Sequence, residues 1–176
     1  GPKGIGGLYI SEKAKKDIGP LIHGGGQQMG WRGGTLNTTG IVGMAAALRI
    51  SLDELDQDHK RVMQLRDLLE TELLGITGTF RNGHPVHRLY NTANICFPGA
   101  LSEQLIMRLG VISVSSGSAC SAITSRPSHV LKAMGLSDLN ALSSIRFSLG
   151  RFTTEAEIGY TVEQVKLQVQ KLRSLS

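Results

Sequence analysis

The chain has 176 residues and a formal net charge of +5, from 19 basic and 14 acidic side chains. A hydrophobic share of 40% is typical of a chain that folds around a core and not of a disordered one. No apolar run approaches the roughly 18 residues that cross a membrane, and one Trp, three Tyr and four Phe leave little for stacking on bases. We therefore expect a folded protein that binds neither a membrane nor nucleic acid.

The cysteines indicate a reducing compartment. Cys96 and Cys120 are the two cysteines of the sequence, too few for a disulfide framework in a chain of this length. The first residues also lack the apolar core of a signal peptide. Both features predict the cytoplasm or, in a eukaryote, an organelle matrix.

The first 51 residues combine a short apolar run with segments rich in glycine. Residues 4–10 are expected to form a glycine-led strand. The glycines of residues 23–35 let backbone N–H groups approach an anion closely. Thr39 is expected to cap a helix that begins near Gly40. We interpret residues 1–51 as the end of another domain.

Residues 52–176 then alternate between helix and strand patterns. A long helix that stops at Gly75 is predicted by apolar residues that recur at spacings of three and four. These residues are Val62, Leu65, Leu69 and Leu73. Residues 91–97 alternate between apolar and polar side chains, as a half-buried strand does, and this placement makes Cys96 a structural residue.

Two short helices are predicted in the middle of this region. Residues 103–109 form the first helix, which Gly110 closes. Residues 111–114 then indicate a strand that leads into the segment around the second cysteine. Pro127 suits the first turn of the next helix, and Gly135 ends it.

The last part of the chain is expected to form a strand over residues 144–149 and a final helix. Thr154 and Glu157 have the spacing of a capping box at the start of that helix. Its buried face is predicted to consist of Ile158, Val162, Val165, Val169 and Leu172. The whole pattern predicts an α+β layer in which helices cover a sheet of at least three strands.

The residues most informative about function are SSGSAC, at positions 115–120. This stretch is too small and polar for a core segment, so the thiol of Cys120 is expected to be accessible. A thiolate is a nucleophile where the thiol is partly exposed in an electropositive setting. Taken alone, the segment leaves open the alternative that Cys120 is one of the many cysteines that serve as small buried apolar residues.

Three separate motifs, read together, indicate a protein family. They are the Gly33-Gly34-Thr35 of the glycine-rich segment, the loop that contains Cys120, and SSIRFSLGRFTTE at residues 143–155. Together they closely resemble the C-terminal part of pyridoxal-phosphate-dependent cysteine desulfurases of the NifS/IscS kind, in the class-V aminotransferase family. The resemblance runs over nearly the whole chain. It implies the fold-type-I α/β architecture, with residues 1–51 ending the large cofactor domain and 52–176 forming the small α+β domain.

The resemblance implies a role for four residues. Cys120 is the sulfur acceptor, whose thiolate takes the sulfur of L-cysteine and becomes a persulfide while L-alanine is released. Arg146 binds the substrate carboxylate, although a surface ion pair is its alternative role. Thr35 donates to the phosphate of pyridoxal phosphate across a homodimer interface, and Gly34 permits close backbone approach, although the two could also form an ordinary turn.

The resemblance also implies a lysine that holds the cofactor as a Schiff base, and the family has it just before the Gly-Pro-Lys-Gly that opens this sequence. Lys3 lies inside that later motif and Lys60 in a polar helical stretch, so neither is assigned this role. We therefore expect the complete protein to be the catalyst and this chain alone to be inactive. The implied partner is a sulfur acceptor or an iron-sulfur scaffold protein, for cluster assembly or thio-modification.

Three alternatives remain open from the sequence. A selenocysteine lyase would share the same fold and motifs. A persulfide carrier without catalysis would explain the missing lysine. His84, His87 and Cys96 could instead bind a metal, although one H-x-x-H with a distant cysteine is poor evidence, and our assignment includes no metal site.

Overall fold

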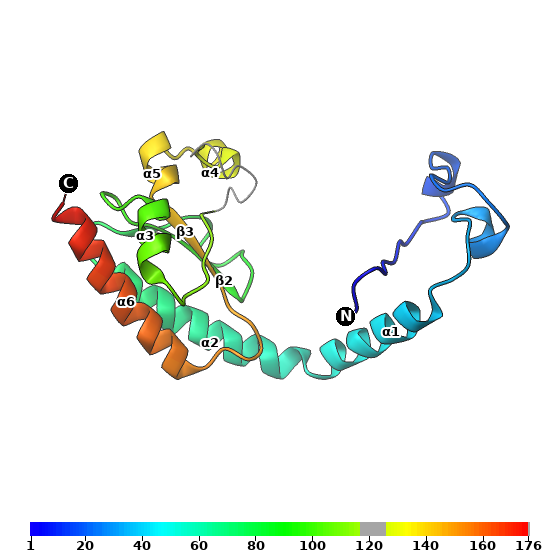
Figure 1. The fold of residues 1–176 in the computed structure, drawn as a ribbon, viewed down its shortest axis with the longest axis horizontal. Helices are drawn as coiled ribbons and strands as arrows, with labels where there is room; N and C mark the ends of the chain where they lie inside the picture. The colour runs from blue at the N-terminus through cyan, green and yellow to red at the C-terminus, as the bar shows by residue number, and fades with distance from the viewer. Residues whose placement is uncertain (117–125, 176) are drawn as a thin grey trace. The chain divides into compact units, whose positions relative to one another are not determined.

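A computed structural model describes residues 1–116 and 126–175 of the chain (Figure 1). Its backbone contacts divide the chain into two compact units, Gly1–Leu55 and Asp56–Ser176, and each is described by itself. The helices are α1 (Thr38–Asp53), α2 (Leu55–Leu74), α3 (Ser102–Leu109), α4 (His129–Ala133), α5 (Asp138–Leu142) and α6 (Glu155–Arg173), with 3₁₀ turns at Ala14–Lys16 and Gln27–Gly30. The strands are β1 (Phe80–Arg81), β2 (Thr92–Cys96) and β3 (Ser144–Ser148).

The first unit ends in α1, whose start differs from the predicted one by two residues. The side chain of Asn37, and not that of Thr39, caps the helix by accepting a hydrogen bond from the N–H of Gly40 at 3.0 Å. Asn is at least as good an N-cap as Thr, because its short side-chain oxygen reaches the unpaired N–H groups of the first turn. Thr39 therefore lies inside the helix.

The predicted strand at residues 4–10 is wrong. Residues 5–10 have no regular secondary structure, and Leu8 and Tyr9 are exposed. The apolar residues at the end of this segment suggested a strand, but a strand forms only where a neighbouring strand accepts and donates the ladder hydrogen bonds. Within the described residues no such neighbour pairs with this segment.

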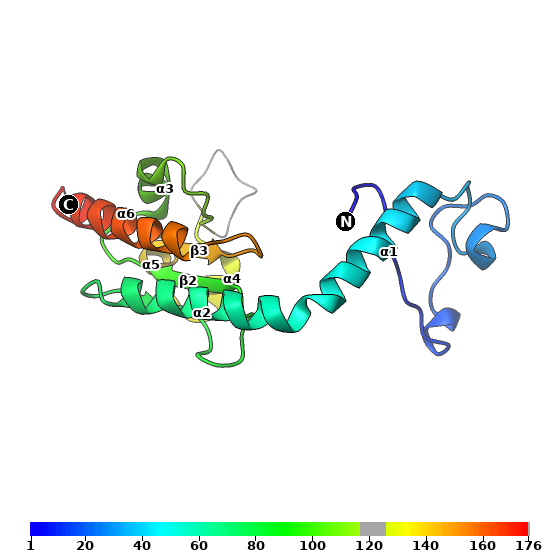
Figure 2. The same ribbon diagram turned by 90° about the horizontal axis from the view of Figure 1, so that it is seen from below.

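The second unit is built on a small antiparallel sheet with the strand order β1-β2-β3. The register pairs Asn94 of β2 with Arg146 of β3, and Ile95 with Ile145. Because side chains alternate across a sheet, Ile95 and Ile145 share one face and Asn94 and Arg146 share the other. Figures 1 and 2 show α2 and α6 side by side along this sheet.

The hydrophobic core lies between one face of the sheet and the helices α2, α3 and α6. Its most buried large side chains are Leu69, Leu73, Ile95, Phe97, Leu105, Ile145, Val165 and Val169. The rings of Phe97 and Phe147 meet edge to face, with their centroids 6.4 Å apart. Burial of each such side chain stabilises the fold by about 1.5–3 kcal/mol. The apolar patterns of the sequence therefore predicted the core-facing residues of α2 and α6 correctly.

The structure of α6 confirms the two predictions made for it, the capping box and the buried apolar face. The Thr154 hydroxyl accepts from the N–H of Glu157 at 3.3 Å, and the Glu157 carboxylate accepts from the N–H of Thr154 at 2.8 Å. These bonds complete the predicted capping box. All five apolar residues predicted for the buried face of α6 are buried.

The predicted strand at residues 111–114 is also wrong. Gly110 closes α3 at a φ of 58°, and the N–H of Ile112 donates back to the carbonyl of Leu109 at 3.2 Å, so the chain turns at Gly110 and Val111, and residues 112–114 have no regular secondary structure. Val111 is exposed. A run of β-branched residues suggested a strand. The N–H of Ile112 bonds instead to the last turn of α3 and not to a neighbouring strand. The third strand of the sheet is instead β1, which has two residues.

The region after the cysteine segment contains two short helices where one was predicted. Ser128 caps α4, so Pro127 lies before the helix and not in its first turn. Gly135, at a φ of 91°, follows the helix as expected. Ser137 then caps α5, which the sequence patterns did not predict because five residues are too few for a clear periodicity.

A cluster of buried charges joins α2 to the sheet and to the segment before β2. Glu70 of α2 is 4% exposed, and its carboxylate accepts from Arg81 at 2.7 Å and from Arg88 at 2.9 Å. Burial acts to raise the pKa of Glu70, but the hydrogen bonds and charges of Arg88 and Arg81 together hold it below its ordinary value. Glu70 is therefore a charged residue within the fold, stabilised by two guanidinium groups.

No helix in the part of the chain that the structure describes combines the length and the apolar character needed to span a membrane.

Candidate active site

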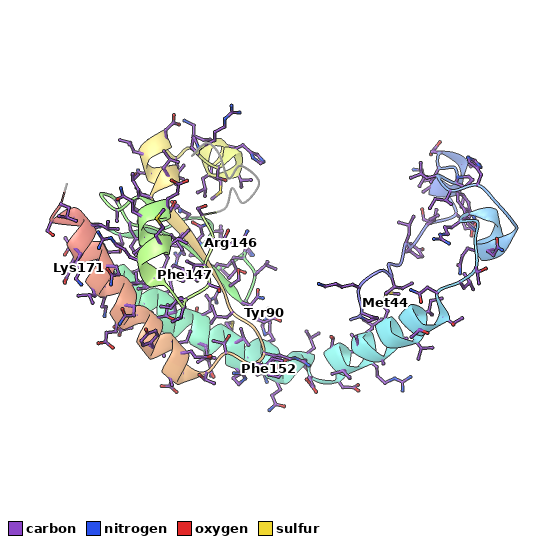
Figure 3. All side chains as sticks on the ribbon, viewed as in Figure 1. Met44, Tyr90, Arg146, Phe147, Phe152 and Lys171 are labelled. Atoms are coloured by element: carbon purple, nitrogen blue, oxygen red, sulfur yellow. The ribbon has the colours of Figure 1, made fainter. Side chains whose placement is uncertain are left out.

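Arg146 lies on β3, on the face of the sheet opposite the core. Its neighbour Phe147 is 3% exposed and packs in the core, whereas Arg146 is exposed; both are labelled in Figure 3. The strand alternation thus turns the guanidinium away from the apolar helices. Within the described residues, the guanidinium of Arg146 has no hydrogen bond or ion pair. An exposed guanidinium, with its planar fork of donors, is suited to binding an anion.

Arg146 is also paired with the segment that leads to Cys120. The N–H of Arg146 donates to the carbonyl of Ser115 at 2.7 Å, and the N–H of Ser115 donates to the carbonyl of Arg146 at 3.2 Å. The two residues are 31 positions apart in the sequence, so no local pattern predicts this contact. The pairing holds the start of the cysteine segment beside the strand of Arg146.

Cys120 itself lies outside the described residues, as do all of residues 117–125. Ser115, five positions earlier, belongs to the bridge with Arg146.

Gly34 and Thr35 belong to the first unit, at the end of the glycine-rich segment. The segment is closed by a hydrogen bond from the N–H of Gly33 to the carbonyl of Ile22 at 3.0 Å. Gly34 has a φ of 102°, a conformation that side chains disfavour, and its N–H donates to the side-chain oxygen of Gln27 at 3.1 Å. Thr35 follows with an exposed side chain.

Next to Arg146, the outer face of the sheet carries a network of polar side chains. Nδ2 of Asn82 donates to Oδ1 of Asn94 at 2.7 Å and to Oγ of Ser144 at 2.9 Å. The Ser144 hydroxyl and the Cys96 thiol both donate to the carbonyl of Asn140 in α5, at 2.7 and 3.3 Å. These hydrogen bonds hold α5 over the outer face of the sheet. They also connect Asn140 to Asn94, the residue of β2 that is paired with Arg146.

Cys96 is a structural residue, as its place in a strand predicted. Its side chain is completely buried, and this burial raises the pKa of the thiol above its ordinary value. A buried, protonated thiol is a poor nucleophile. Cys96 is therefore poorly suited to act as a nucleophile.

The structure does not bring His84, His87 and Cys96 together as a group of metal ligands. Nδ1 of His84 accepts hydrogen bonds from the N–H groups of Val86 and His87, at 3.0 and 2.9 Å, and the thiol of Cys96 is directed to Asn140. Among residues 1–116 and 126–175, no three His, Cys, Asp or Glu side chains gather in a group that could bind a metal ion. The two histidines form a local turn.

Comparison with known proteins identifies the family. The family model described as aminotransferase class-V matches residues 1–160. The chain belongs to the class-V aminotransferase family. The resemblance that the sequence motifs indicated is therefore confirmed.

Class-V relatives are similar to this chain over all of its residues. It is 51% identical to the cysteine desulfurase IscS of Pasteurella multocida and 49% identical to that of Methylobacillus flagellatus, in each case over 100% of this chain and 44% of the relative. The chain thus spans less than half the length of these curated relatives. A solved NifS-like protein has 35% identity and a TM-score of 0.76, over 88% of this chain and 40% of its own. The predicted fold class is confirmed.

Class-V proteins are generally pyridoxal-phosphate-dependent, and one part of this chain fits the phosphate group of that cofactor. The hydroxyl of Thr35 is exposed, and Arg32 lies close to it in the sequence with a cationic side chain. Nη1 of Arg32 donates to the carbonyl of Gly33 at 2.9 Å, so this side chain lies against the loop. A hydroxyl donor and a guanidinium are both suited to a phosphate.

The predicted site residues thus fall in two parts of the chain. Thr35 and Gly34 lie in the unit Gly1–Leu55, whereas Arg146 lies in the unit Asp56–Ser176, and each is placed within its own unit only. Ser115 and Asn94, the two cross-strand neighbours of Arg146, were not predicted from the sequence. Their proximity to Arg146 depends on strand pairing, which single-residue patterns do not specify.

Proposed function

We propose that the complete protein containing this chain is a pyridoxal-phosphate-dependent cysteine desulfurase. It moves the sulfur of L-cysteine to Cys120 and releases L-alanine. The observation that carries the proposal is the pairing of Ser115 with Arg146, which connects the strand of an exposed guanidinium to the segment of Cys120. About 50% identity to cysteine desulfurases over every residue of the chain supports it.

Arg146 binds the carboxylate of the substrate in this proposal. A guanidinium offers a planar fork of donors that matches the two oxygens of a carboxylate. Its exposure on the outer face of β3, and the absence of a competing acid among the described residues, support the role. Binding at this point orients the sulfur end of L-cysteine toward the cysteine segment.

Cys120 accepts the sulfur. Its thiolate attacks the sulfur atom of the bound L-cysteine, so that a sulfur–sulfur bond forms as the carbon–sulfur bond breaks. The electron pair of the broken bond stays with the carbon, which takes up a proton and leaves as the methyl group of L-alanine. The enzyme retains a persulfide, and no external oxidant or reductant is required.

Thr35 and Gly34 contribute to binding the cofactor, with Thr35 donating to the phosphate across the interface of a homodimer. Pyridoxal phosphate supplies an electron sink for the carbon skeleton of the substrate when it is bound. The left-handed backbone at Gly34 and the exposed hydroxyl of Thr35 support this assignment. Residues 1–51 are then the end of the large cofactor domain and 52–176 the small domain.

The proposal extends to the partners and the location of the complete protein. The persulfide sulfur passes to an acceptor such as an iron-sulfur scaffold protein, for cluster assembly or thio-modification. The relatives are named cysteine desulfurases, which supports the supply of sulfur to such an acceptor. A reducing compartment, the cytoplasm or an organelle matrix, suits a persulfide because exposed thiols stay reduced there.

We expect the substitution Arg146→Ala to raise the KM for L-cysteine about a hundredfold in the complete, cofactor-loaded protein. The reason is the loss of two charge-assisted hydrogen bonds to the carboxylate. Arg146→Lys should give an intermediate KM, because lysine keeps the charge without the fork of donors. Steady-state assays of alanine formation measure both effects.

Arg108, an exposed cation in the last turn of α3, provides the matched control. The substitution Arg108→Ala removes one positive charge without touching β3, and its KM should stay within about twofold of the wild-type value. An unchanged KM in Arg146→Ala, or an equal rise in both variants, would refute the carboxylate assignment.

A further inference from the structure

The backbone of Arg146 determines which neighbour lies closest to its side chain. Both its N–H and its carbonyl bond to Ser115, at 2.7 and 3.2 Å. In an antiparallel sheet these two groups of one residue point to the same side of the strand. Toward β2, Arg146 therefore forms a non-hydrogen-bonded pair with Asn94, the kind of pair in which opposing side chains are closest, with Cα atoms about 4.5 Å apart.

The hydrogen bonds of Asn94 agree with this geometry. Its carbonyl accepts from the N–H of Asn82 at 2.8 Å, on the side away from Arg146. Asn94 and Arg146 also share the outer face of the sheet, because Ile95 and Phe147, their neighbours along the two strands, are both buried in the core. The amide of Asn94 and the stem of Arg146 thus project side by side.

The polar network determines how the Asn94 amide is oriented. The carbonyl of Asn140 can only accept, so the Ser144 hydroxyl donates to it at 2.7 Å. Oγ of Ser144 then accepts from Nδ2 of Asn82, whose nitrogen is identified by this bond. The same nitrogen donates to Asn94 at 2.7 Å, so the Asn94 atom it meets is the oxygen Oδ1. The amide nitrogen Nδ2 of Asn94 is left as a donor.

Two donors without an acceptor therefore stand next to each other on this face. Neither Nδ2 of Asn94 nor the guanidinium of Arg146 has a hydrogen-bond partner in the described part of the chain. The two groups cannot bond to each other, because both only donate. A carboxylate, with two acceptor oxygens, can satisfy both.

We infer that Asn94 is a second donor to the carboxylate of the amino-acid substrate, beside Arg146. This inference rests on the proposed function, in which Arg146 binds that carboxylate. Asn94 thereby contributes to specificity for an amino acid with a free carboxylate over an amine or ester that lacks one. The chain of hydrogen bonds from Asn140 through Ser144 and Asn82 orients the amide of Asn94, so that Nδ2 of Asn94 is the atom that can donate to the carboxylate.

The test combines a change in the protein with a change in the ligand. Calorimetry measures the Kd of the product, L-alanine, and of L-alanine methyl ester for the complete, cofactor-loaded protein. We expect Asn94→Ala to weaken L-alanine binding about tenfold or more, the effect of a lost hydrogen bond to a charged group. The Kd of the ester, which has no carboxylate charge, should change by less than about twofold.

Two further variants separate a binding role from a structural one. Asn94→Asp keeps the oxygen that accepts from Asn82 but replaces the donor by a negative oxygen, so it should weaken L-alanine binding more than Asn94→Ala does. Thr92→Ala changes a half-buried residue on the same strand and face and should leave both Kd values unchanged. Thermal unfolding of each variant reports on the fold.

Equal losses for L-alanine and its ester in Asn94→Ala, or no loss for L-alanine, would overturn the inference. Tighter binding of L-alanine by Asn94→Asp would do so as well. The proposed function is judged by a separate result, the formation of L-alanine from L-cysteine by the wild-type protein. Because the binding experiment uses the product and needs no turnover, the two failures are distinguishable.

Discussion

Substitution of Cys120 by Ala is expected to lower the rate of alanine formation from L-cysteine by at least about a thousandfold in the complete protein. A covalent nucleophile has no substitute in the site, so its removal eliminates the step and does not merely slow binding. The absorbance of the bound cofactor should stay unchanged, because Cys120 has no role in holding it. Parallel measurements of cofactor absorbance and of alanine release test both statements.

Cys96 provides the control for this prediction. Its thiol is completely buried and protonated at neutral pH, since burial raises its pKa. Cys96→Ser should keep the activity within a few-fold of wild type, and any loss should follow a loss of stability. Full activity in Cys120→Ala would refute the assignment of Cys120 as the sulfur acceptor. If instead a stably folded Cys96→Ser variant lost all activity, Cys96 would be assigned that role.

Substitution of Glu70 by Gln is expected to destabilise the chain by about 3–5 kcal/mol, the usual cost of removing one partner from a buried ion pair. Glu70 is 4% exposed and is the shared acceptor of Arg81 and Arg88. Gln keeps the size of the side chain but leaves the two guanidinium groups without a countercharge. Urea unfolding of the 176-residue chain, followed by circular dichroism, measures the loss.

The matched control is the exposed pair of Glu72, on the same helix as Glu70, with Lys166 of α6. These groups lie 2.6 Å apart, but their side chains are 47% and 41% exposed, so Glu72→Gln should cost no more than about 1 kcal/mol. If Glu72→Gln cost as much as Glu70→Gln, burial would not be the reason for the effect.

The charge of Glu70 also makes the stability depend on pH. Because the pKa of Glu70 is lower in the folded chain than its ordinary value of 4.5, its contribution is fully present above that value. The contribution is lost as the pH falls below 4.5 and through the folded pKa. The difference in unfolding free energy between wild type and Glu70→Gln should therefore shrink on acidification. A difference independent of pH would contradict this account.

The elements that could be predicted from the sequence are those whose signals are local. The Thr154–Glu157 box and the apolar period of α6 lie within one helix, and the structure contains both. The outward placement of Arg146 follows in the same way from the alternation of β3. Local signals failed where two of them compete. Asn37 and Thr39 are both good caps, and only Asn37 is placed to accept from Gly40.

The neighbours of Arg146 could not be predicted, for a physical reason. Ser115 and Asn94 reach it through hydrogen bonds and strand register between segments far apart in the sequence. A shift of one residue in register would turn either side chain to the other face. Family motifs pointed to Arg146 and Cys120 separately, and the Ser115 bridge is what connects the strand of one to the segment of the other.

The most direct test of the central claim is to locate the transferred sulfur. The complete protein, loaded with pyridoxal phosphate, is mixed with L-cysteine without a reductant, its thiols are capped by alkylation, and its peptides are weighed by mass spectrometry. We expect one additional sulfur atom on the peptide that contains Cys120, none on the peptide that contains Cys96, and an equal amount of L-alanine. Alanine formation without added sulfur at Cys120 would contradict the claim that this residue accepts the sulfur.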